Sequence, residues 1–236
     1  MKNNIKYSST RGKSVELLFK DVIFEGLAPD GGLYVPETWP KLEKKTLSRF
    51  SGMSYQQIAF EVISPYIDSS LSDDDLKNII DKAYSSFDHP EITPLNKIND
   101  NKYLLELFHG PTYAFKDVAM QFISQLMGFY LKQEDRSLNI LGATSGDTGA
   151  AAIESFKNIK SVKIFILHPY NKISEVQRKF MTTIKSDNVF NIAVKGSFDD
   201  CQNIIKQIFS DQSYKKNNNL TAINSINWAR IMCQIV

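Results

Sequence analysis

The clearest hydrophobic pattern of the chain lies near its middle. Apolar side chains recur there at spacings of three and four, which predicts a helix with a wide apolar face, formed by Phe115, Val118, Ala119, Phe122, Ile123, Leu126 and Met127. Lys116 falls in the first turn of this helix, where the helix dipole favours an anion such as Asp117. That field, together with the rings of Phe108, Tyr113 and Phe115, disfavours the ammonium form and favours a nucleophilic amine. A snorkelling surface lysine is the alternative, and this segment alone leaves it open.

The chain before this helix has a different texture. Residues 26–36 are rich in glycine and proline and end in a short extended piece, Leu33–Val35. Apolar periodicity then predicts helices over residues 55–67 and 73–87, the second capped by Ser72. The sequence therefore predicts a small, mainly helical N-terminal domain over residues 1–92.

Strand and helix patterns alternate over the second predicted domain, residues 93–236. Four short apolar strands are each followed by a helical pattern, in the segments "YLLELF", "SLNILGAT", "SVKIFILH" and "VFNIAVKG". Such alternation predicts an α/β fold with βαβ units and an open, mostly parallel sheet covered on both faces. Ligands bind beyond the carboxyl ends of such strands. The segments "HGPTYAFKD" and "GATSGDTGAAA" are both predicted to lie at such ends.

Composition excludes several classes of function. The 236 residues carry a net charge of +2 and are 42% hydrophobic, so a globular core is expected and a strongly electrostatic partner is not. No basic patch of the kind that binds nucleic acid is visible. Cys201 and Cys233 have no metal-type spacing with the histidines, so buried free thiols and no metal site are expected. The first residues lack the apolar core of a signal peptide and no apolar run reaches the roughly 20 residues of a membrane span, so a soluble cytoplasmic protein is expected.

The segment "GATSGDTGAAA" has the composition of an anion-binding turn. Gly146 and Gly149 permit tight turns, and Ser145, Asp147 and Thr148 place polar groups at a helix start whose free amides would bind a carboxylate or phosphate. A plain capped turn between strand and helix is the alternative. The spacing matches neither a dinucleotide fingerprint nor a nucleotide loop with its own lysine. A nucleophilic lysine facing such a turn is what an enzyme with a carbonyl cofactor needs.

At this point the sequence resembles a known family. The segment "HGPTYAFKD" followed by "ATSGDTGAAA" closely resembles the threonine synthases, pyridoxal-phosphate enzymes of the tryptophan-synthase-β fold group. The resemblance extends to "STRG", "EGLAPDGGLYVP", "SFDDCQ" and "NSINWARI". It therefore spans almost the whole chain through several independent segments.

The resemblance implies a cofactor, a substrate and a set of site residues. The cofactor is pyridoxal 5'-phosphate, and the family's Schiff-base lysine maps onto Lys116. Phe115 and Asp147 are expected at the cofactor. The substrate is O-phospho-L-homoserine, which reacts with water to give L-threonine and phosphate. The loop expected to bind its carboxylate consists of Thr144, Ser145, Gly146, Asp147 and Thr148.

Two further residues are possible contributors to substrate binding. Arg11 could bind a substrate anion or pair within the N-terminal domain. His109 could contribute in the same way or orient the turn before the helix. The resemblance also suggests a monomer.

One departure from the family's pattern concerns the C-terminal side. Enzymes of this fold bind the cofactor phosphate with a glycine-rich loop and the pyridine nitrogen with a hydroxyl residue, both after the "NSINWAR" segment. The chain ends at "IMCQIV" before either could appear. We therefore expect the N-terminal half of a longer enzyme, with an incomplete catalytic fold and no activity on its own. The alternatives are a threonine-synthase-like phospho-lyase, which releases a keto acid and ammonia, and a non-catalytic relative.

Overall fold

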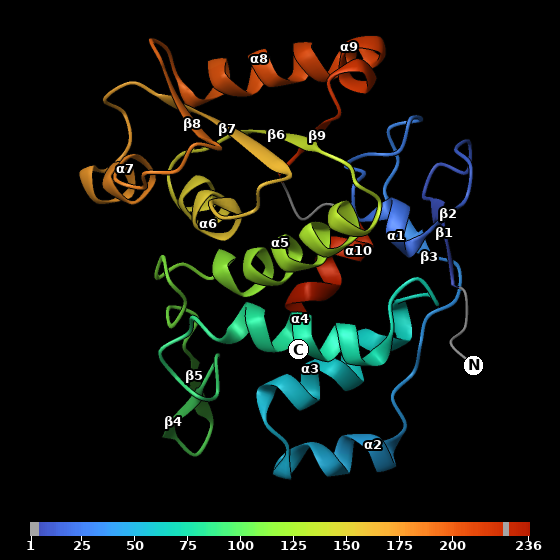
Figure 1. Cartoon of the computed structure of the whole chain (residues 1–236). Coiled ribbons are helices and arrows are strands. Elements are labelled where there is room, and N and C mark those ends of the chain that lie inside the picture. The colour runs from blue at the N-terminus through green and yellow to red at the C-terminus, as the bar shows by residue number, and fades with distance from the viewer. Residues whose placement is uncertain (1–4, 224–226) are drawn as a thin grey trace. The chain divides into compact units, whose positions relative to one another are not determined.

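The chain divides into two compact units in a computed structural model that describes residues 5–223 and 227–236. Unit 1 comprises Met1–Ile123 together with Ser225–Val236, and unit 2 comprises Ser124–Asn224. Helix α5, Lys116–Gln133, begins in unit 1 and continues into unit 2 (Figure 1). The domain boundary drawn between residues 92 and 93 from the texture of the sequence stays a prediction.

Unit 1 begins with a small antiparallel sheet in the order β2-β1-β3. Its strands are β1 (Lys6–Ser9), β2 (Leu17–Leu18) and β3 (Tyr34–Pro36), and the short helix α1 (Phe19–Val22) follows β2. The predicted extended piece is thus present, shifted by one residue. Tyr7 and Tyr34 are buried where β1 and β3 pair, which gives this small sheet an aromatic core.

Three helices follow the sheet in unit 1, namely α2 (Lys44–Arg49), α3 (Tyr55–Ile63) and α4 (Asp73–Tyr84). A single 3-10 turn, η1 (Phe50–Gly52), connects the first two. The helix predicted over residues 55–67 ends early and continues as the 3-10 turn η2 (Ser64–Tyr66), because Pro65 has no amide to donate. The Ser72 cap is confirmed, since its side chain accepts from the Asp75 amide.

The C-terminal residues belong to unit 1, where they form α10 (Trp228–Ile231) and the turn η3 (Met232–Gln234). The Asn227 side chain donates to the carbonyl oxygens of Val22 and Glu25. Arg230 is buried, and its Nε donates to the Ile23 carbonyl at 3.0 Å. Burial lowers the pKa of Arg230 to about 10. The family-like segment "NSINWARI" therefore serves the structure through residues 227–231, while its first residues, 224–226, lie outside the described part of the chain.

Unit 1 also contains a β-hairpin, which lies where the sequence predicted a strand of the parallel sheet. The strands β4 (Leu95–Asn99) and β5 (Lys102–Leu105) pair antiparallel, and every residue of both is exposed. The segment "YLLELF" was predicted to be a buried strand of the parallel sheet. Within the described residues β5 pairs with β4 alone, so that prediction is wrong. Short apolar runs do not by themselves distinguish a buried strand from an exposed one.

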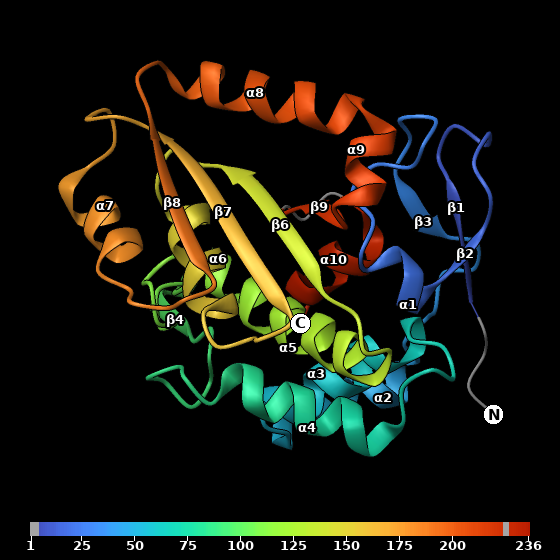
Figure 2. The ribbon, with the colours of Figure 1, turned by 45° about the horizontal axis from the view of Figure 1, so that its top comes forward.

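Unit 2 contains the predicted parallel sheet, with strand order β8-β7-β6-β9. All of its strand pairs are parallel (Figure 2), which confirms the α/β class. The strands are β6 (Leu138–Ala143), β7 (Val162–Pro169), β8 (Val189–Val194) and β9 (Leu220–Ala222). The helices are the remainder of α5, then α6 (Asp147–Phe156), α7 (Glu175–Thr182), α8 (Phe198–Ser210) and α9 (Gln212–Asn217).

Helices cover both faces of this sheet. Helix α8 packs on one face through a buried cluster that includes Leu141, Leu167 and Cys201, and α6 lies on the opposite face (Figure 2). Cys201 and Cys233 are buried free thiols, as predicted. Across residues 5–223 and 227–236, no helix combines the length and the apolar character needed to cross a membrane.

Candidate active site

The turn before α5 is fixed by a buried carboxylate. Asp117 is fully buried, and its two carboxylate oxygens accept from the amide and the hydroxyl of Thr112, both at 2.8 Å. Gly110 packs against the same side chain so closely that a Cβ added there would lie 2.4 Å from the Cβ of Asp117. Tyr113, between them, has a left-handed backbone with φ of 57°. The sequence "GPTYAFKD" is therefore one locked turn, and Lys116 is the first helical residue after it.

Lys116 is partly buried at this helix start. Its Nζ lies 4.4 Å from the centre of the Phe115 ring, a cation–π contact between neighbouring residues. Phe108, Tyr113 and Phe115 are themselves largely exposed. The Phe115 ring therefore lies beside the amine, whereas desolvation of Lys116 by Phe108 and Tyr113 stays a prediction.

His109 is engaged by two carboxylates of unit 1. Its Nδ1 lies 2.8 Å from Asp88 Oδ1 and its Nε2 lies 2.8 Å from Glu106 Oε2. The hydrogen bond to Glu106 and then that to Asp88 raise the pKa of His109, although desolvation opposes them. The Asp88 amide also donates to the His109 carbonyl at 3.0 Å. Of the two roles left open for His109, the structure favours the one of orienting the turn.

Arg11 is likewise engaged within the N-terminal sheet. Its Nη1 donates to the Asp30 carbonyl at 2.9 Å. Burial raises the pKa of the Asp30 carboxyl, but hydrogen bonds from Ser9, Gly32 and Lys13 outweigh it and bring the pKa to about 2. The motifs "STRG" and "PDGG" thus meet at one carboxylate, which gives them a structural role.

The loop between β6 and α6 is organised by a buried hydroxyl. Thr144 is buried, and its Oγ1 accepts from the amides of Gly146 and Gly149, both at 2.9 Å. The amide of Thr148 donates to Asp147 Oδ1 at 2.8 Å. The prediction that the amides of this loop are free for an anion is therefore wrong for these three, because nearby side chains satisfy them first. The accessible part of the loop is Ser145, which is exposed, with the half-buried Asp147 and Thr148.

Helix α7 packs against this loop, a contact that sequence reasoning missed. Gly146 has a φ of 145°, which strongly favours glycine, and a Cβ there would lie 2.3 Å from the side chain of Gln177 on α7. At Gly149, a Cβ would meet Thr144 at 2.5 Å and the sulfur of Met181 at 2.8 Å. No local pattern marks Gln177, because the contact joins two helices that are separated by the whole of β7.

Side-chain hydrogen bonds therefore hold the turn in both predicted site segments. The turn before Lys116 belongs to unit 1, and the loop 144–149 belongs to unit 2. That the two segments face one another stays a prediction.

Comparison with known proteins gives one consistent result. Residues 6–84 match the family model described as "Threonine synthase N terminus". The threonine synthase of Pseudomonas aeruginosa is 49% identical over 232 residues, which cover 98% of this chain and 50% of the relative. The chain matches the N-terminal half of threonine synthase.

Solved structures give the same match. A pyridoxal-phosphate-bound threonine synthase from Brucella melitensis superposes with a TM-score of 0.93 at 43% identity, over 98% of this chain and 50% of that structure. The yeast threonine synthase gives a TM-score of 0.90, covering 48% of its length. A protein of Xenopus laevis named threonine synthase-like 2 is 40% identical over 98% of this chain. The chain therefore spans about half the length of the threonine synthases that it matches.

Proposed function

We propose that this chain is the lysine-bearing half of a threonine synthase, which converts O-phospho-L-homoserine and water into L-threonine and phosphate. The observation that carries the proposal is the 49% identity along 98% of the chain, together with Lys116 as the first residue of α5. Because the chain spans about half the length of this relative, we expect activity to require the second half of a threonine-synthase-type chain.

The residues of unit 1 suit pyridoxal phosphate as the cofactor. Lys116 presents a primary amine beside an aromatic ring, at a helix start held in one conformation by the buried Asp117. A fixed amine is the group through which such enzymes hold the cofactor carbonyl. When bound, the cofactor supplies an electron sink for the substrate carbons.

Each residue then has a distinct role in the proposed reaction. Lys116 would remove a proton from Cα of the substrate and then one from Cβ; phosphate leaves from Cγ, which takes up a proton and becomes the methyl group. Water then gives its hydroxyl to Cβ and its proton to the released phosphate, and Cα takes up a proton again. Ser145 and Thr148 bind the substrate carboxylate with their hydroxyls, and Asp147 lies beside the cofactor. Thr144 positions the loop, because its hydroxyl already accepts two backbone amides.

The first test joins this chain to the C-terminal half of the Pseudomonas aeruginosa relative and measures threonine and phosphate formed from O-phospho-L-homoserine. We expect stoichiometric amounts of both, and a loss of about 1,000-fold or more in Lys116→Ala. Lys132→Ala, near the other end of α5, is the matched control and should retain activity. Activity retained in Lys116→Ala would overturn the assignment.

A second readout does not depend on turnover. The joined chain is incubated with pyridoxal phosphate, reduced with borohydride and digested, and the modified peptide is identified by mass spectrometry. We expect the label on Lys116. Preferential labelling elsewhere would contradict its role even if the protein were inactive.

The phospho-lyase alternative predicts a different product. Keto acid and ammonia in place of threonine in the same assay would favour it.

A further inference from the structure

Strand β8 forms one edge of the parallel sheet of unit 2. In the strand order β8-β7-β6-β9, β8 pairs with β7 alone among the described residues. Proteins commonly protect such an edge with a proline, a bulge or a charged side chain. The six residues of β8, "VFNIAV", contain neither a proline nor a charge, and their pairing with β7 runs without a register shift. The edge is therefore suited to the addition of another strand.

The backbone of β8 offers hydrogen-bonding groups on its outer side. The carbonyls of Asn188 and Val194 accept from the β7 side, both at 2.8 Å. Because the backbone groups of successive residues point to opposite sides of a strand, the amides and carbonyls of Asn191 and Ala193 point outward. Val189 offers its carbonyl alone on that side, since its amide donates within the preceding turn. Donors and acceptors therefore alternate along the free edge.

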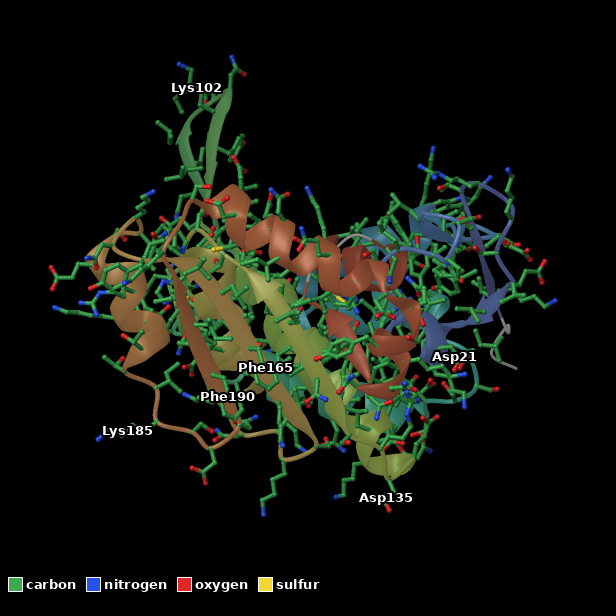
Figure 3. All side chains as sticks on the ribbon, turned by 90° about the horizontal axis from the view of Figure 1, so that it is seen from above. Asp21, Lys102, Asp135, Phe165, Lys185 and Phe190 are labelled. Atoms are coloured by element: carbon green, nitrogen blue, oxygen red, sulfur yellow. The ribbon has the colours of Figure 1, made fainter. Side chains whose placement is uncertain are left out.

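Apolar side chains extend one face of the sheet to this edge. Phe190 is 39% exposed and Ile192 is 41% exposed, and their spacing of two places them on the same face. The Phe190 ring stacks on Phe165 of β7, with centroids 4.7 Å apart, and the two rings lie side by side in Figure 3. The Asn191 side chain points to the opposite face, where it donates to the Met181 carbonyl of α7. The face that carries Phe190 thus stays apolar as far as the outer side of β8.

A two-fold axis at Asn191 makes this edge complementary to itself. In antiparallel pairing, residues whose backbone groups face the partner strand lie directly opposite one another. With Asn191 opposite Asn191 of a second copy, the Ala193 amide of each copy reaches the Val189 carbonyl of the other. The same register places Phe190 opposite Ile192 on the shared apolar face. Main-chain hydrogen bonds and apolar pairs would therefore join two copies in one register.

The charges at the two ends of β8 fit the same register. Asp187 precedes the strand, Lys195 follows it, and both side chains are exposed. Antiparallel pairing about Asn191 brings Asp187 of each copy toward Lys195 of the other, which is favourable. Parallel pairing of two copies would instead bring equal charges together. The charge pattern thus favours a second copy in the antiparallel orientation.

We propose that the outer edge of β8 binds a second copy of this chain, with the two β8 strands antiparallel about Asn191. The two four-stranded sheets then form one continuous sheet across a symmetric interface. Because the interface is only one strand wide, the dimer is weak, with a Kd on the order of 10 μM. The inference rests on β8 and not on the reaction proposed above. The monomer suggested by the family resemblance stays the competing prediction.

Analytical ultracentrifugation over a range of concentrations tests for this dimer. It is applied to the chain alone and to the chain joined to the C-terminal half of the Pseudomonas aeruginosa relative. We expect both to pass from monomer to dimer between about 1 and 100 μM. In hydrogen exchange, the amides of Asn191 and Ala193 should exchange about 10-fold more slowly at the highest concentration than at the lowest. A joined chain that is still monomeric at about 500 μM would overturn the proposal.

Matched variants separate this edge from the rest of the surface. Ile192→Lys places a charge in the apolar pair and should weaken dimerisation about 30-fold or more. Ala193→Pro removes an outward amide but no hydrogen bond to β7, so it should abolish the dimer and melt within about 2 °C of the parent. Val176→Lys, at a 64% exposed position on α7, is the control and should leave the Kd unchanged. Parent-like dimerisation of Ala193→Pro would refute the proposal even if Ile192→Lys failed to fold.

Exchanging the end charges tests the register itself. Asp187→Lys brings lysines together at both ends of the interface and should weaken dimerisation about 10-fold at low salt. Lys195→Asp should weaken it similarly by bringing carboxylates together. The double variant restores opposite charges and should regain most of the parent affinity. A double variant as weak as either single variant would contradict pairing about Asn191.

Discussion

The turns that lead into α5 and α6 fix a helix start in opposite ways. Before α5, a buried carboxylate on the helix reaches back, and Asp117 accepts both donors of Thr112. Before α6, a buried hydroxyl at the strand end reaches forward, and Thr144 accepts the amides of Gly146 and Gly149. One anchor is a group that carries negative charge when ionised and the other is neutral.

This difference suits the charges that the two turns are proposed to meet. A carboxylate beside Lys116 offsets the positive end of the α5 dipole, which would otherwise repel the amine. A carboxylate in place of Thr144 would repel an anionic substrate, whereas a hydroxyl orders the loop and preserves the positive end of the α6 dipole. The carboxylate of Asp117 thus suits the amine of Lys116, and the neutral hydroxyl of Thr144 suits the anionic substrate that is proposed to bind at its loop.

Removing the charged anchor should have the largest effect. In Asp117→Ala the amide and hydroxyl of Thr112 lose their buried acceptor, and we expect a loss of about 3–4 kcal/mol in the free energy of unfolding. Urea denaturation measures it. Asp73→Ala, at the exposed first turn of α4, is the control and should cost about 0.5 kcal/mol. Similar losses for the two variants would show that the buried carboxylate is not an anchor.

Straining the neutral turn should have the next largest effect. Gly146→Ala combines an unfavourable φ with a collision against Gln177, and we expect a loss of about 2–3 kcal/mol. Adding Gln177→Ala removes the collision but not the backbone strain. The double variant should therefore recover about 1 kcal/mol relative to Gly146→Ala in the same unfolding assay. Full recovery would mean that the backbone conformation carries no strain.

Removing the neutral anchor itself should cost somewhat less. Thr144→Val keeps the shape but leaves two buried amides without their acceptor, for an expected loss of about 2 kcal/mol. Thr144→Ser keeps the hydroxyl and should lose less than about 1 kcal/mol. If the two variants are equally stable in thermal unfolding, the hydroxyl does not hold the loop.

The smallest effect is a pH dependence confined to unit 1. The raised pKa of His109 means that its ion pairs stabilise the folded state fully below the ordinary histidine pKa of about 6.5. This contribution is lost as the pH rises through the folded-state pKa. The parent should therefore lose stability relative to His109→Gln as the pH rises above about 6.5, as followed by urea midpoints. Parallel profiles would show that folding leaves the pKa of His109 unchanged.

Periodicity predicted most of the regular elements, because each buries one face. The helix at Lys116, the Ser72 cap and the strands β6, β7 and β8 all appear close to where they were predicted. The strand "YLLELF" failed because its apolar residues are exposed in a hairpin, where apolar content does not report burial.

The details of the candidate site were harder to predict. Asp117 was interpreted as a dipole partner, although its main contacts are to Thr112, five residues earlier. The amides of loop 144–149 were expected to be free, but Thr144 competes for them locally. Gln177 left no signal, because its contact with Gly146 depends on the packing of two helices. The predictions for Asp117 and for the loop amides were incomplete because each group had several possible hydrogen-bond partners close by.

The contact of Asn227 with Val22, across 205 positions, has a consequence for the order of synthesis. Unit 1 is discontinuous, and the residues that hold α1 are made only after all of unit 2. During synthesis on the ribosome, the N-terminal 123 residues therefore lack their hydrogen bonds to Asn227 until the parallel sheet has been made. A nascent chain halted before residue 227 should leave α1 open to protease, and release of the next ten residues should close it.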